Sequence, residues 1–240
     1  MDLIYLFIVF VAASFLQSIT GFGFAIISMP VLMLIFPIRT TAAIVALASF
    51  MHCFQVAFKM RKHIDWKIIL FPVIFAFIGR LLGMNLLMTA NEEILKTLLG
   101  VILILMTLYF IFFKNKVKVD PNKKNGMIYG FMSGILGGMF NTGGPPMVMY
   151  YFFAIPDKLI YIASIQFTFA VGNLFSIILH KGYGNYSEVS FLMIAAAFAA
   201  AFLGSHFGCK TVKKIKDISF YVYLSMIIMG IFLIVESNFF

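Results

Sequence analysis

Charged residues are scarce in this sequence, because Asp, Glu, Lys and Arg fill 11% of its 240 positions whereas 62% are hydrophobic. A soluble monomer of this composition would expose apolar patches larger than the roughly 300–600 Å² that is normal for such proteins. The scarcity of charge therefore excludes an ordinary soluble domain. It predicts a protein whose surface largely faces lipid.

Acidic residues are scarcer than basic ones, with 9 Asp and Glu against 18 Lys and Arg. All of the acidic residues fall in predicted loops or at predicted helix ends. Proton relays and many cation sites of membrane proteins keep a carboxylate near the bilayer centre. This distribution argues against a metal-cation carrier and against a carboxylate-driven proton antiporter. The simplest remaining mechanism is facilitated exit of an anion, which the membrane potential can drive.

Cysteine and histidine are also rare, with 2 and 4 copies. Cys53 and Cys209 fall in or beside apolar stretches, which favours two small buried thiols over a disulfide. The sequence contains no paired carboxylates, no histidine cluster and no evident pairing of a nucleophile with a base. We therefore expect no enzyme, no metal site and no cofactor.

Long hydrophobic runs make up most of the chain. Six of them approach the roughly 20 residues that cross a bilayer, and the other four are short and form two adjacent pairs. Such runs are predicted to be helices, in an all-α polytopic membrane protein. No cleavable signal peptide is expected, since Met1-Asp2 lacks a positively charged start. The predicted runs are 3–16, 24–36, 41–58, 68–88, 94–113, 126–140, 146–155, 159–179, 189–207 and 218–235.

The basic residues are concentrated in three predicted loops, at 59–67, 114–124 and 210–216. Loops rich in Lys and Arg usually face the cytoplasm. The intervening loops, around Glu92 and at 181–188, should then be external, as should both termini. This distribution accounts for the net charge of +9 without a nucleic-acid partner.

The two halves of the chain follow the same plan. Residues 1–115 and 125–240 each contain a short broken-helix pair and then three transmembrane helices, and a basic cytoplasmic linker at 116–124 joins them. Equivalent loops of the two halves carry opposite charge signals, so they should face opposite sides of the membrane. We therefore predict two inverted repeats, an architecture that places a binding site near the midplane between them.

Glycine and proline mark equivalent places in the two halves. Pro30 aligns with Pro146, and the Gly79-x-x-x-Gly83 motif aligns with Gly204-x-x-x-Gly208. Small residues at such spacing let membrane helices approach closely. The same packing role is expected for the four-residue series Gly126, Gly130, Gly134 and Gly138.

The breaks within the two short pairs, at 17–23 and 141–146, combine glycine with hydroxyl and amide side chains. Unwound backbone at membrane depth is tolerated where it lines a cavity. Each break starts a new helix, whose free N–H groups and dipole attract an anion. Two ordinary tight turns are the alternative. The predicted substrate-binding residues at the breaks are Gln17, Ser18, Thr20, Gly21, Gly23, Asn141, Thr142, Gly143 and Gly144.

Three further polar residues within the spans are candidates for the same site. Arg80 is the charged residue that lies well inside a span, where it would either bind an oxyanion or extend to the membrane surface. Gln166 and Asn173 are seven positions apart and share a helix face. They would either line the cavity or form hydrogen bonds between helices.

These motifs together resemble the TauE/SafE family of sulfite exporters, over nearly the whole chain. The resemblance rests on Gln17-x-x-x-Gly21-x-Gly23 with Pro30, His63-Ile64-Asp65-Trp66, Gly79-x-x-x-Gly83, and Ser133-Gly134-x-x-Gly137-Gly138 followed by Gly143-Gly144-Pro145-Pro146. The sequence departs from the family in keeping few glycines at the first break. The resemblance implies a bacterial inner-membrane protein that exports sulfite, sulfoacetate or a related organosulfur anion.

The expected partners are therefore a small anion and the lipid bilayer, and the oligomeric state stays open. A non-transporting membrane partner or sensor is one alternative function. A carrier of another substrate class, such as metal cations, is the other.

Overall fold

The computed structural model describes residues 2–112, 119–211 and 219–239. These residues are almost entirely helical, with no strand among them, as the sequence predicts. The helices are α1 (Asp2–Thr20), α2 (Phe24–Leu32), α3 (Ile38–Lys59), η1 (Arg61–His63), α4 (Trp66–Thr89), α5 (Glu92–Phe112), α6 (Lys123–Phe140), α7 (Gly144–Ala154), α8 (Lys158–Gly182), α9 (Phe191–Thr211) and α10 (Ser219–Phe239).

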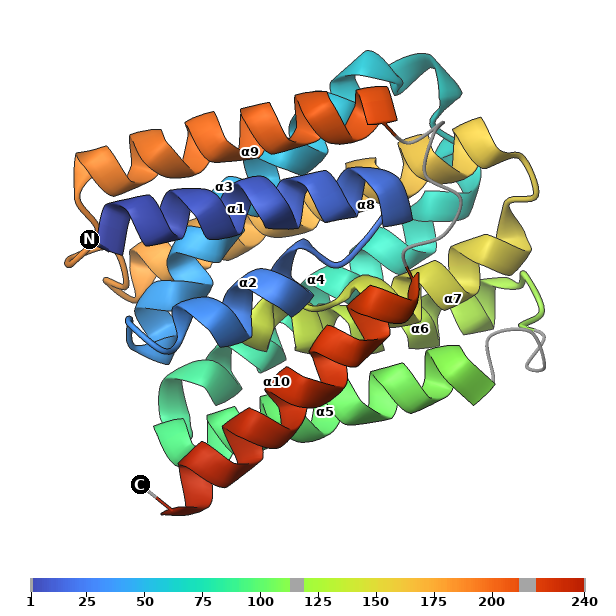
Figure 1. Ribbon diagram of the computed structural model, residues 1–240. Coiled ribbons are helices and arrows are strands. Elements are labelled where there is room, and N and C mark those ends of the chain that lie inside the picture. The colour runs from blue at the N-terminus through green and yellow to red at the C-terminus, as the bar shows by residue number, and fades with distance from the viewer. Residues whose placement is uncertain (1, 113–118, 212–218, 240) are drawn as a thin grey trace.

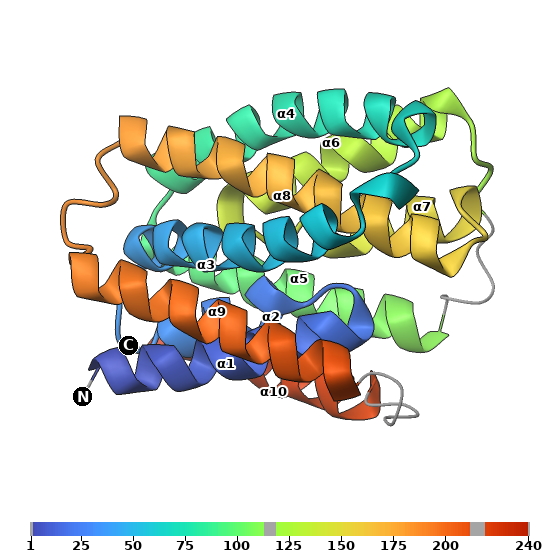
Figure 2. The ribbon, with the colours of Figure 1, turned by 90° about the horizontal axis from the view of Figure 1, so that it is seen from above.

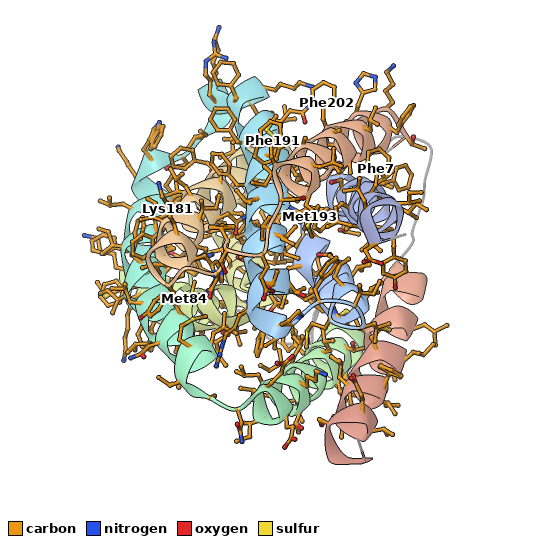
Figure 3. The ribbon with its side chains drawn as sticks, turned by 90° about the vertical axis from the view of Figure 1, so that its left-hand side faces the viewer. Phe7, Met84, Lys181, Phe191, Met193 and Phe202 are labelled. Atoms are coloured by element: carbon orange, nitrogen blue, oxygen red, sulfur yellow. The ribbon has the colours of Figure 1, made fainter. Side chains whose placement is uncertain are left out.

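Six helices of the described chain are long and apolar enough to cross a membrane, namely α1, α3, α4, α5, α8 and α9. The chain is therefore a multi-pass membrane protein. Viewed along the helices (Figure 3), α3 lies in the middle of the bundle, with Met84, Lys181 and Met193 of neighbouring helices around it. In keeping with this place, α3 is the most buried of the six, at 67% of its span.

The first short pair differs from its prediction. A short helix over 3–16 was expected, but α1 runs from Asp2 to Thr20 and is long enough to span by itself. The polar residues at its end are compatible with the helix because their hydroxyls are satisfied by carbonyls four residues earlier, Ser18 by Ser14 (2.8 Å) and Thr20 by Leu16 (2.9 Å). Each pair is thus one long helix and one short helix, α1 with α2 and α6 with α7.

The short helix α2 turns back along α1, so that this pair forms a hairpin (Figure 1). The ends of α3 and α9 and the start of α6 gather at one end of the bundle, whereas the two chain termini lie at the other end (Figures 1 and 2). The described parts of the three basic loops therefore share one end, as predicted. Part of the 116–124 linker and the basic residues at 114–118 and 213–216 lie outside the described residues.

Glycines bring two pairs of helices into direct backbone contact. On α4 and α6, a methyl group added at Gly79 would overlap the carbonyl oxygen of Phe131, and one added at Gly134 would overlap that of Ala76. On α9, a methyl group at Gly204 would overlap the carbonyl oxygen of Val11 in α1. The predicted small-residue packing is confirmed for these motifs. The other close helix pairs are α3 with α8 and α5 with α10.

Candidate functional site

Each break turns on a residue with left-handed backbone. In the first break, Gly21 and Gly23 have φ angles of 84° and 109°, which other residues rarely adopt. In the second break, Asn141 has a φ of 54°, a conformation that asparagine tolerates better than most residues. The Asn141 amide donates to the carbonyl of Ala42 in α3 at 2.8 Å. Both chain reversals are therefore built into the local sequence.

The two breaks meet inside the bundle. A methyl group at Gly144 would lie 3.3 Å from the Cβ atom of Phe22, so the second break touches the first. Between them lies a cavity of about 20 Å³, which has room for about one water molecule. The predicted site residues that line this cavity are Gln17, Gly23, Arg80, Asn141, Thr142, Gly143, Gly144 and Asn173.

Gln17 ties the first break together. Its Oε1 accepts the N–H of Phe24 at 2.9 Å and so caps the start of α2. Its Nε2 donates to the Cys53 sulfur at 3.1 Å and to Gln166 Oε1 at 3.4 Å. Gln166 in turn donates to the carbonyl of Gly21 at 3.2 Å. Gln166 therefore supports the first break through these hydrogen bonds and does not line the cavity.

The two helix starts offer different numbers of backbone donors. In α2, the N–H groups of Ala25 and Ile26 belong to the first turn, which has no intrahelical acceptors, and both residues line the cavity. In α7, Pro145 and Pro146 occupy the first turn and have no N–H group. The sequence predicts two equivalent anion-attracting helix ends. The structure gives α2 more free donors than α7.

Arg80 is buried against both breaks. Its side chain is 5% exposed and lines the cavity, so it does not extend to the membrane surface. Nη1 donates to the carbonyl of Gly137 at 3.2 Å and to Ser176 Oγ at 2.5 Å, while Nε has no partner within the described residues. Gly172 leaves room for the guanidinium, since a methyl group there would lie 2.6 Å from Nη2.

No acidic side chain in the described part of the chain forms an ion pair with Arg80. An unpaired buried charge is costly in a protein interior. A guanidinium also binds oxyanions through paired, charge-assisted hydrogen bonds. The cavity therefore carries a positive charge that an anion would compensate.

Polar groups from α3 and α8 complete the wall. Asn173 donates to Ser49 Oγ at 2.8 Å, and both side chains are buried. The sequence interpretation missed Ser49, although a polar residue on the buried face of a span was a usable signal. It also missed Phe22 and Phe169, which line the cavity as apolar groups and carry no chemical signal in the sequence.

Besides Gln166, three further predicted site residues, Ser18, Thr20 and Gly21, lie outside the cavity wall. The Ser18 hydroxyl bonds to its own helix and Ser18 faces Gly208 of α9, whereas the Thr20 hydroxyl bonds both to its own helix and to the carbonyl of Phe22 in the break. Gly21 lies at the turn, with its carbonyl bonded to Gln166. These residues shape the break and do not line the cavity.

The two cysteines are both free. Cys53 is buried, as predicted, and accepts a hydrogen bond from Gln17, whereas Cys209 is exposed and its predicted burial is wrong. Cys209 lies near the end of α9, where the helix reaches the surface of the bundle. Among the described residues, no group of three His, Cys, Asp or Glu side chains could hold a metal ion.

Comparison with known proteins places this chain. The family profile described as "Sulfite exporter TauE/SafE" matches residues 6–233. A similar protein is the "Probable sulfite/organosulfonate exporter TauE" of Cupriavidus necator, which is 25% identical over 146 residues, or 59% of this chain and 57% of that protein. No solved structure shows significant similarity to the present chain. Since the family profile covers nearly the whole sequence, the chain belongs to the sulfite exporter TauE/SafE family.

Proposed function

We propose that this protein is a transporter of the bacterial inner membrane that exports small sulfur-containing anions, such as sulfite or an organosulfonate. The family and the name of the Cupriavidus relative support the substrate class. One observation carries the proposal. The cavity between the two broken helices contains the buried guanidinium of Arg80, which has no acidic partner in the described chain.

The anion would sit between Arg80 and the start of α2. There the free N–H groups of Ala25 and Ile26 and the polar pair of Ser49 and Asn173 surround the same space. A charged guanidinium and a helix N-terminus both favour a negative ligand. The same groups disfavour a metal cation, because they would add like charge to it.

Transport would use two repeats that exchange roles. If the repeats are equivalent, α1 to α5 correspond in order to α6 to α10. Under this correspondence the pair α1–α9 is equivalent to the pair α6–α4, and the pairs α3–α8 and α5–α10 are each equivalent to themselves. This pairing is what inverted repeats at 1–115 and 125–240 would produce. The cavity has room for about one water. Entry of an oxyanion therefore requires the two breaks to move apart, which rocking of one repeat against the other would achieve.

The basic end of the bundle is proposed to face the cytoplasm. An anion that leaves from this side moves down the electrical gradient of a respiring cell, because the membrane potential is negative inside. Export then needs no carboxylate relay.

The test is flux in proteoliposomes of the purified protein. Sulfite, sulfate, sulfoacetate and acetate are compared, with nickel as the cation control. Saturable movement of a sulfur oxyanion is expected, with acetate carried more slowly. Flux of nickel would favour a cation carrier, and the absence of flux for every anion would favour a partner or sensor protein. Either result would overturn the proposal.

A further inference from the structure

A second hollow lies on the outer surface of the bundle, away from the two breaks. It is a groove of about 270 Å³ between α3 and α8, close to η1. Helices α3 and α8 lie side by side, with η1 continuing from the end of α3 (Figure 2). The groove walls are apolar apart from one charged side chain.

Stacked aromatic rings form one wall. Phe50, Phe54 and Phe58 follow each other at successive turns of α3, with ring centres 5.6 and 5.9 Å apart. On the other side, Trp66 packs edge-on against Phe167 at 4.9 Å. Two buried small residues, Ala57 and Ala170, also line the groove.

The charged side chain is Arg61, at the η1 end of the groove. Its Nη1 donates to the carbonyl of Phe58 at 3.1 Å, and its guanidinium carbon lies 4.7 Å from the centre of the Phe58 ring. Arg61 forms no ion pair within the described residues. These contacts hold the cation beside the rings.

The surroundings of Arg61 are basic. Lys59 ends α3, Lys62 lies in η1, and Lys67 lies in the first turn of α4. The one acidic residue there, Asp65, accepts the N–H groups of Lys67 and Ile68 with its carboxylate and so caps α4. The η1 end of the groove therefore combines a net positive charge with an apolar channel that leads away from it.

We propose that this groove is a binding site for an anionic phospholipid, with one acyl chain along the rings and the headgroup phosphate on Arg61. The apolar walls offer a soluble polar ligand few hydrogen-bond partners, since the polar side-chain groups among the lining residues are the guanidinium of Arg61 and the indole N–H of Trp66. A second copy of the chain fits less well in this groove. In a twofold dimer built on this face, the basic cluster of one protomer would lie close to the identical basic cluster of its partner, and the two would repel each other. A lipid supplies both the hydrocarbon and the negative charge that this site requires.

Trp66 makes the site directly observable, because it is the single tryptophan of the chain and is 59% exposed in the groove wall. The protein is placed in phosphatidylcholine nanodiscs that contain brominated phosphatidylglycerol or, in parallel, brominated phosphatidylcholine at equal mole fraction. Bromine quenches the tryptophan fluorescence on contact. We expect half-maximal quenching at about fivefold lower mole fraction for the anionic lipid, the effect of about one cationic side chain near a lipid phosphate.

Two variants separate the groove from the general basic surface. Arg61→Gln should abolish most of this preference, whereas Lys67→Gln, in the first turn of α4 and not among the groove-lining residues, should retain it. Equal quenching by the two lipids would overturn the proposal, since it indicates ordinary lipid contact. Absence of quenching by both lipids would also overturn it, since it indicates that another protein surface covers Trp66.

Discussion

Arg80 donates to the carbonyl of Gly137 at 3.2 Å, and the same carbonyl accepts the N–H of Asn141 at the second break. The buried guanidinium and the turn at Asn141 therefore share one hydrogen-bond acceptor, the carbonyl of Gly137. An anion that draws the guanidinium toward itself would also pull on the turn that starts the second broken helix.

The first prediction concerns this charge. Arg80→Gln should lower kcat/KM for sulfite export by about 100-fold, because the buried hydrogen bonds of a charged group are worth up to roughly 3 kcal/mol. Arg80→Lys should recover only part of the loss, since an ammonium group cannot replace the paired hydrogen-bond donors of the planar guanidinium. Initial rates in proteoliposomes, normalised to the amount of inserted protein, provide the measurement. Wild-type rates in Arg80→Gln would remove Arg80 from the site.

The second prediction concerns the contact between the breaks. Gly144→Leu should abolish flux while the protein still inserts, because the new side chain meets Phe22 across the cavity. Phe22→Ala in the same chain should restore part of the flux, since it returns the lost space. A double-mutant cycle of flux rates measures this coupling. Additive effects of the two substitutions would show that they do not share the cavity.

Gly143 is a poor choice for that experiment. A side chain there would overlap the backbone of Ser133, so its replacement is expected to disturb the fold itself. Loss of flux in a Gly143 variant would therefore not distinguish a site from a structural position.

The third prediction concerns stability. Gly134→Ala should destabilise the protein by about 1–3 kcal/mol, because its methyl group overlaps the backbone of Ala76 in α4. Gly182→Ala is the matched control, since a methyl group there meets nothing within 4 Å. Thermal unfolding in detergent compares the two variants. An equal Tm for both would show that the α4–α6 contact tolerates a wider spacing.

The fourth prediction concerns orientation. Cys209 is exposed near the basic end of the bundle and Cys53 is buried, so a membrane-impermeant maleimide should label Cys209 alone. Labelling is expected in inverted membrane vesicles and not in intact cells, because the basic end is proposed to face the cytoplasm. Cys53→Ser should leave the labelling unchanged. Labelling of intact cells would reverse the proposed orientation.

Much of the fold follows from the pattern of the sequence. Run length predicts the spans, and the glycine spacing predicts the contact that the structure shows between Gly134 and Ala76. The length of α1 could not be predicted from hydrophobicity, because Ser18 and Thr20 look like loop residues until their hydroxyls bond to the helix that carries them.

The site was partly predictable for a similar reason. Glycines at a break indicate backbone that must turn, and a charge inside a span indicates either a binding group or one that extends to the membrane surface, so Gly23 and Arg80 were named as candidates, and both line the cavity. Side-chain direction was not readable, so the sequence could not tell that Gln166 lies behind the break while Ser49 lies on the wall. That distinction depends on how α3 and α8 rotate against each other.

The prolines at the start of α7 have a consequence for the transport cycle. If the two repeats exchange shapes, an exact copy of each would make the inward-open and outward-open forms equal in free energy. Pro145 and Pro146 would break that equality in the ligand-bound forms, because the second helix start has fewer N–H groups for a ligand than the first. The two loaded forms would then differ in free energy, so the carrier would hold its cargo more tightly when one particular face is open. The membrane potential still sets the direction of net flow, but this difference would set the side on which the carrier releases its cargo more slowly.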